Sequence, residues 1–117
     1  MLIVYASSTG NVKRFVSKLT FPSIAITEGL HIEEPYILIT YTTGFGQVPD
    51  EVKSFLKENR SYIKGVAASG NKNWGGYFAR SGDLVALQYQ VPVLHKFELS
   101  GLPRDVEIFE KRVEEFV

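Results

Sequence analysis

Strand-like and helix-like segments alternate along the whole chain, and this alternation restricts the possible folds more than any other feature. Short apolar runs rich in β-forming residues occupy positions 2–6, 23–27, 36–41, 62–69 and 91–99. Apolar residues recur at helical spacing in the intervening and final segments, at positions 12–19, 48–56, 77–89 and 103–116. Such an order is typical of parallel strands joined by helical crossovers. We therefore predict an α/β fold, and 117 residues suit a single domain spanning 1–117.

Composition excludes several classes of protein. Thirteen Lys and Arg balance thirteen Asp and Glu, so the chain lacks the positive field of a nonspecific nucleic-acid binder, and we expect no nucleic-acid partner. The absence of cysteine excludes disulfides, iron–sulfur clusters and thiolate zinc sites. No signal-peptide pattern opens the chain, and no apolar run approaches the roughly 18 residues of a membrane span. We expect a cytoplasmic protein without a membrane partner.

Three segments follow predicted strands and combine hydroxyls, amides and glycines, namely residues 7–11, 42–47 and 69–76. Ligands of parallel α/β sheets bind at the carboxyl ends of strands, where these segments should meet. None of the three contains Asp, Glu or His, which argues against a receiver-type divalent-ion site. His31 and His95 have no metal-ligand spacing, and we interpret them as one surface and one satisfied strand histidine. We predict no metal site.

The first segment, Ser7 to Asn11, suits a phosphate, since it offers hydroxyl donors and a glycine before a predicted helix. It has neither a Gly-Lys-Ser/Thr nor a Gly-x-Gly-x-x-Gly pattern, so nucleotide hydrolysis and dinucleotide binding are not indicated. An ordinary turn, with Asn11 as the helix cap, is an equally good interpretation of these residues alone.

Aromatic residues border the other two segments. Tyr41 precedes the second and Phe45 lies within it, on either side of Gly44, while Trp74 lies in the third and Tyr77 just beyond it. A flat conjugated ligand binds well between aromatic faces and close peptide groups. Phe78 is better explained as a core residue, but a Trp between an Asn and two glycines is not.

Four stretches carry a resemblance to a known family, namely residues 8–15, 41–49, 67–75 and 95–101. They read STGNVKRF, YTTGFGQVP, AASGNKNWG and HKFELSG, and the similarity extends over essentially the whole chain. The chain resembles the NrdI family of the flavodoxin-like superfamily. This resemblance implies a three-layer sandwich around a five-stranded parallel sheet of order 2-1-3-4-5.

The resemblance also implies FMN as the cofactor. Its phosphate would lie on the first segment, and its isoalloxazine ring between the second and third. The cofactor-binding residues implied in this way are Ser7, Ser8, Thr9, Gly10, Asn11, Val12, Thr42, Thr43, Gly44, Phe45, Gly46, Ser69, Gly70, Asn71, Trp74 and Gly75. No side chain is assigned a catalytic role. Gly44 is expected to interact with flavin N5, with Gly46 as the competing position.

In this family the reduced flavin reacts with molecular oxygen and supplies superoxide or peroxide to the small subunit of class Ib ribonucleotide reductase. That oxidant serves the assembly of a dimanganese tyrosyl-radical cofactor. The implied partners are this subunit, oxygen and an unidentified flavin reductant, and the chain would be a redox accessory protein rather than a stand-alone metabolic enzyme. A general electron-transfer flavodoxin and a redox-inactive module for another phosphorylated ligand are the alternatives.

Two expectations concern the third segment. Lys72, Asn73 and Trp74 are expected to belong to the partner interface, because an exposed Trp among small polar residues suits an anchor. Because the three segments contain Lys72 and no carboxylate, the anionic reduced flavin should be penalised less than in an acidic flavodoxin.

Overall fold

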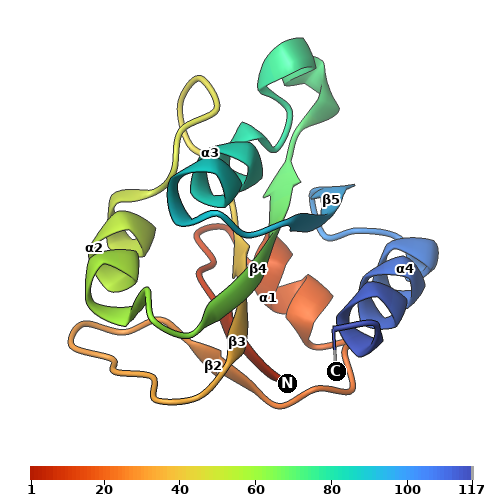
Figure 1. Ribbon diagram of the computed structural model, residues 1–117. Helices are drawn as coiled ribbons and strands as arrows, with labels where there is room; N and C mark the ends of the chain where they lie inside the picture. Colours follow the sequence, from red (N-terminus) through yellow and green to blue (C-terminus); the bar gives the residue numbers. More distant parts are fainter. Residues whose placement is uncertain (117) are drawn as a thin grey trace.

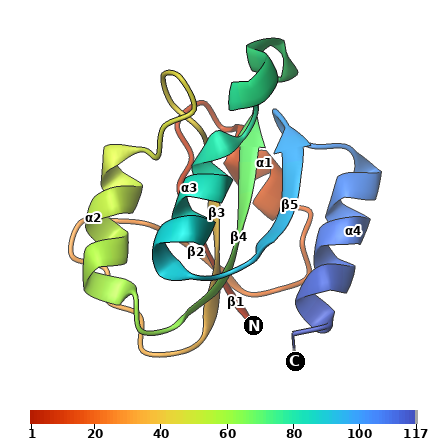
Figure 2. The same ribbon diagram turned by 45° about the horizontal axis from the view of Figure 1, so that its top comes forward.

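Five parallel strands form one sheet with the order β2-β1-β3-β4-β5 in the computed structural model, which describes residues 1–116. Figures 1 and 2 show helices on both faces of this sheet. The strands are β1 (Leu2–Tyr5), β2 (Ser23–Ala25), β3 (Tyr36–Thr40), β4 (Ile63–Gly70) and β5 (Val93–Glu98). The helices are α1 (Asn11–Val16), α2 (Asp50–Asn59), α3 (Arg80–Tyr89) and α4 (Pro103–Glu114). The predicted three-layer sandwich and its strand order are confirmed.

Two apolar layers hold the sheet in place. On one face, α1 and α4 pack through Phe15, which stacks on Phe97 with ring centroids 3.9 Å apart and meets Phe109 edge-on. On the other face, the residues of α2 and α3 pack around Tyr36. Every residue of β3 is buried, as expected for the central strand between two helical layers. Among residues 1–116, no helix is both long and apolar enough to cross a membrane.

Local structure differs from the sequence prediction at both ends of α1, which ends at Val16 rather than residue 19, and before α3. Asn11 is the first residue of α1 rather than its cap, because Gly10 takes the cap position with φ +91° and the Ser7 hydroxyl accepts the Lys13 N–H at 3.2 Å. The predicted helix from residue 77 begins only at Arg80. A short 3-10 segment, η1 (Lys72–Tyr77), precedes it.

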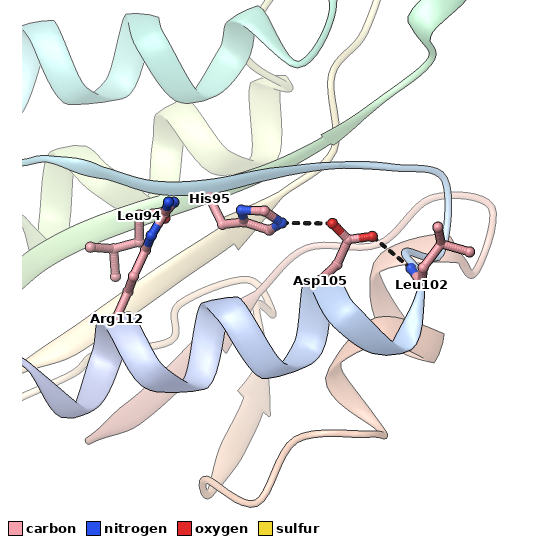
Figure 3. Close-up of polar contacts among 5 residues, drawn as sticks. All are labelled: Leu94, His95, Leu102, Asp105 and Arg112. Carbon is pink, nitrogen blue, oxygen red and sulfur yellow. Dashed lines mark hydrogen bonds and ion pairs between the residues drawn. The ribbon is translucent and has the colours of Figure 1, made fainter.

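A hydrogen bond between His95 of β5 and Asp105 of α4 connects these two elements (Figure 3). His95 Nε2 lies 2.7 Å from Asp105 Oδ1, and the Leu102 N–H donates to Asp105 Oδ2 at 2.7 Å. Burial raises the pKa of the Asp105 carboxyl, but the Leu102 N–H and the His95 ring lower it more, so the net pKa is below its ordinary value. His31 is exposed, 3.2 Å from Glu33, so both histidines occupy the kinds of position predicted for them.

We expect Asp105→Asn to lower the free energy of unfolding by about 1 kcal/mol at neutral pH, because the carboxylate loses a charge-assisted hydrogen bond. A depressed carboxyl pKa stabilises the fold above its unfolded value of about 3.9, and this stabilisation is lost as the pH falls through the folded pKa. Urea unfolding of parent and variant from pH 7 to pH 3 should therefore show a difference that shrinks below about pH 4. The exposed Glu107→Gln change on the same helix is the control. A difference independent of pH would contradict this account.

Candidate functional site

A cavity of about 260 Å³ opens at the carboxyl ends of β1, β3 and β4. The loops that form it extend beyond the sheet at the end where η1 lies (Figure 2). Its wall consists of Ser8, Thr9, Asn11, Val12, Tyr41, Thr42, Thr43, Gly44, Ser69, Gly70, Asn71, Trp74, Tyr77, Ala79 and Leu99. The structure thus brings together the three segments that the sequence singled out.

Five of the residues predicted to bind the cofactor lie outside this wall, namely Ser7, Gly10, Phe45, Gly46 and Gly75. The Ser7 hydroxyl accepts the Lys13 N–H in the first turn of α1. Phe45 points outward with 66% of its surface exposed. Gly46 is buried with φ +86°, and a Cβ there would lie 2.9 Å from the Arg80 side chain. Gly46 therefore shapes the loop, whereas Gly44, the glycine expected to interact with flavin N5, lines the cavity.

Sequence reasoning missed a fourth contributor to the wall, the loop after β5. Leu99 lines the cavity, its N–H donates to the Gly70 carbonyl at 3.0 Å, and its own carbonyl accepts the Ser69 hydroxyl at 2.6 Å. The carboxyl-end rule applies to β5 as well, and the Ser-Gly pair at 100–101 was the available signal. Ala79 also lines the wall, and nothing in its sequence context marks it.

Polar groups of the wall are hydrogen-bonded to one another and to the buried Ser81 hydroxyl. Thr42 donates to the Ser69 carbonyl at 2.9 Å, and its hydroxyl lies 2.7 Å from that of Ser81. Within the described part of the chain, tyrosines are the only titratable residues of this wall. Burial, with the nearby Glu51 carboxylate, raises the pKa of Tyr41 to about 12, so this phenol stays neutral at physiological pH. The wall can bind and orient a ligand.

The rim of the cavity carries exposed aromatic side chains. Phe45 lies edge-on to Trp74 with centroids 5.7 Å apart and near Tyr77 at 6.2 Å. Trp74 is 49% exposed, which agrees with the expectation that it is not a core residue. Phe78, which directly follows η1, is only half-buried rather than a core residue, and the Lys72 ammonium lies 6.0 Å from its ring.

A carboxylate approaches the third segment from β5. Glu98 Oε2 accepts the Lys72 N–H at 3.0 Å. The three segments contain no carboxylate of their own, as the sequence indicates, but this long-range contact places one negative charge beside them. The charge around the cavity is therefore mixed.

Comparison with known proteins gives three consistent results. The sequence profile of the family described as "NrdI Flavodoxin like" matches residues 3–111. Protein NrdI of Bacillus licheniformis is 51% identical over 116 residues, covering 98% of this chain and 88% of that protein. Protein NrdI of Macrococcus caseolyticus is 50% identical over 98% of this chain and 90% of its own length. A short-chain flavodoxin associated with a bacterial microcompartment has a TM-score of 0.73 at 22% identity, covering 97% and 93% of the two chains, and shares the fold.

Proposed function

The chain belongs to the NrdI flavodoxin-like family, and on this premise we propose that it binds FMN and supplies an oxygen-derived oxidant to the small subunit of class Ib ribonucleotide reductase. The observation that best supports the proposal is the composition of the cavity wall, where hydroxyls, amides and aromatic rings surround one space. A bound FMN would supply the redox chemistry, since reduced flavin gives electrons to molecular oxygen.

The wall suits the two chemically different ends of FMN. Thr9 and Asn11 lie at one side, where hydroxyl and amide donors match a phosphate. Tyr41, Trp74 and Tyr77 contribute aromatic surface for a conjugated ring. We propose that the wall residues among those implied by the resemblance hold the cofactor, and that Ser7, Gly10, Phe45, Gly46 and Gly75 support the loops that carry them.

The function is tested in two steps. Protein reconstituted with FMN and then separated from unbound flavin should absorb visible light, which a module for another phosphorylated ligand would not do. Oxygen consumption by the reduced protein is then followed with and without the manganese-loaded small subunit, together with tyrosyl-radical yield. Oxygen consumption that yields radical supports the proposal. Failure to form radical, with efficient electron transfer to other acceptors, would favour a general electron-transfer flavodoxin acting in the cytoplasm.

The partner is proposed to bind over the rim, at Lys72, Asn73 and Trp74. Trp74→Ala should weaken binding of the small subunit about tenfold or more, because exposed tryptophans are frequent interface hot spots. It should weaken FMN binding less. Titration of FMN-loaded protein with the subunit measures the first effect, and Tyr62→Ala, which removes an aromatic residue of 38% exposure elsewhere, is the control. Loss of flavin with unchanged partner affinity would make Trp74 a cofactor residue only.

Gly44 is proposed to adjust its peptide group to the redox state of the cofactor. Its φ is +51° and it lines the cavity, so this backbone can offer an N–H or a carbonyl where a side chain would be strained. Gly44→Ala should shift the balance between oxidised and reduced forms by roughly 1 kcal/mol, measured by potentiometric titration. Gly29→Ala is the control, because it introduces similar backbone strain, at φ +79°, outside the cavity wall and should leave the midpoints unchanged. Equal midpoints in parent and Gly44→Ala would limit this glycine to the turn.

A further inference from the structure

The exposed side chain of Arg14 forms a hydrogen-bonded triangle with two residues beside the cavity. Its Nη2 donates to Asn11 Oδ1 at 2.7 Å, and its Nε donates to Ser100 Oγ at 3.0 Å. The Ser100 hydroxyl donates in turn to Asn11 Oδ1 at 2.8 Å. Arg14 and Asn11 belong to α1, whereas Ser100 follows β5, so the triangle joins segments 86 positions apart.

The arginine sets the direction of every hydrogen bond in this group, because a guanidinium can donate but never accept. Asn11 must therefore turn its oxygen toward Arg14 and Ser100, since the opposite orientation would place amide donors against the guanidinium donors. Its Nδ2 is directed away from them and donates to Thr9 Oγ1 at 3.3 Å. The Thr9 oxygen accepts at that point, which leaves its own hydrogen available for the cavity that Thr9 and Asn11 line.

We propose that Arg14 is a positioning residue that makes the cavity selective for a phosphate-bearing flavin. It orients Asn11, and through Asn11 the Thr9 hydroxyl, so that this side of the wall presents O–H and N–H donors to an anion. Arg14 is absent from the wall formed by residues 1–116, so its effect passes through Asn11. The inference rests on the proposed binding of FMN.

Ser100 keeps its place independently of the guanidinium, because both neighbours are held by other elements. Leu99 donates its N–H to the Gly70 carbonyl at 3.0 Å, and Gly101 donates its N–H to the Glu98 carbonyl at 2.9 Å. Loss of the arginine side chain should therefore leave the loop and the fold intact. The expected effect is a freely rotating Asn11 amide, which can turn its oxygen toward the ligand.

Charge alone would give a different result from orientation. Arg14 is solvent-exposed, so its field at the cavity is screened. Lysine keeps the charge but lacks the planar fork that reaches two acceptors at once. Lys13, an exposed cation next to it on α1, has no such contacts among those the structure gives. Arg14→Lys and Lys13→Met therefore separate orientation from net charge.

The test compares FMN with riboflavin, which lacks the phosphate, by titrating apoprotein and following flavin fluorescence. We expect the parent to prefer FMN and Arg14→Met to reduce that preference about tenfold, the scale of a lost hydrogen bond to a charged group, with riboflavin affinity unchanged. Arg14→Lys should fail to restore the preference, and Lys13→Met should keep it. Ser100→Ala, which removes one of the two donors to Asn11, should lower the preference to an intermediate value.

An unchanged preference in Arg14→Met or in Ser100→Ala would overturn the inference, as would full recovery in Arg14→Lys. Thermal unfolding of each flavin-free variant checks that it is folded. If Arg14→Met does not fold, the flavin preference of Ser100→Ala tests the inference instead. A parent protein that binds neither flavin would contradict the proposed function instead. The two failures are therefore distinguishable.

Discussion

Gly70→Ala is expected to lower the free energy of unfolding by about 2 kcal/mol or more and to abolish flavin binding, the largest effect of any single change in the cavity wall. A Cβ at this position would lie 2.4 Å from the Ala79 nitrogen and 2.9 Å from the Ala79 Cα. Both atoms belong to the backbone, so no side-chain rotation relieves the collision. The end of β4 or the start of α3 has to move.

Such a movement would also displace the loop after β5, because the Gly70 carbonyl accepts the Leu99 N–H. Three parts of the cavity wall, namely the end of β4, Ala79 and the loop after β5, thus require a residue without a side chain at position 70. Urea unfolding and FMN titration measure the two effects. Gly76→Ala is the matched control, since a Cβ there meets no atom within 4 Å and the glycine has no positive φ. If Gly70→Ala is as stable as the parent, the backbone around position 70 can accommodate a Cβ, which contradicts this prediction.

The fold was predictable because each of its elements has a local signature. The unbroken apolar run of residues 36–41 indicates a strand covered on both faces, and all residues of β3 are buried. The helical spacing of Val52, Phe55 and Leu56 indicates the buried side of α2, which the structure confirms. Register and strand order came from the family resemblance instead, since periodicity does not determine which strands are neighbours.

The start of α3 was not predictable in the same way. Tyr77, Phe78 and Ala79 are compatible with a helix by residue type, but Gly75 has φ +55° and ψ −120°, and Ala79 has φ +49°. The close approach of Gly70 to Ala79 belongs to tertiary packing, which overrides weak local preferences. Ala79, a wall residue of ordinary type, is hidden from sequence reasoning for the same reason.

The polar part of the site was predicted better than the contacts behind it. The cavity is lined by Thr9, Asn11, Thr42 and Ser69. They were predictable because hydroxyls and amides that follow strands lie at the edge of the sheet where ligands bind in this topology. The contact of Ser100 with Arg14 joins residues from opposite ends of the sequence. Each of these two residues, taken alone, has the pattern of an ordinary surface side chain.

Thr9→Ala is expected to weaken FMN binding by about 1 to 3 kcal/mol, the range for a lost hydrogen bond to a charged group. The Thr9 hydroxyl accepts from Asn11 at 3.3 Å and keeps its own hydrogen for the cavity, so its removal takes away one donor to the phosphate. Riboflavin should bind parent and variant equally, because it has no phosphate to receive that hydrogen bond.

Thr9→Ser keeps the hydroxyl and should retain most of the FMN affinity, which separates the donor from the bulk of the side chain. Thr20→Ala is a remote control. The Thr20 hydroxyl donates to another anionic group, the Glu110 carboxylate, at 2.7 Å, and Thr20 does not line the cavity. Calorimetric titration of each apoprotein with both flavins gives the affinities. If Thr9→Ala binds FMN as tightly as the parent, the phosphate lies elsewhere. The hydrogen bonds that link Arg14 to Asn11 and Asn11 to Thr9 would then stabilise only the loop.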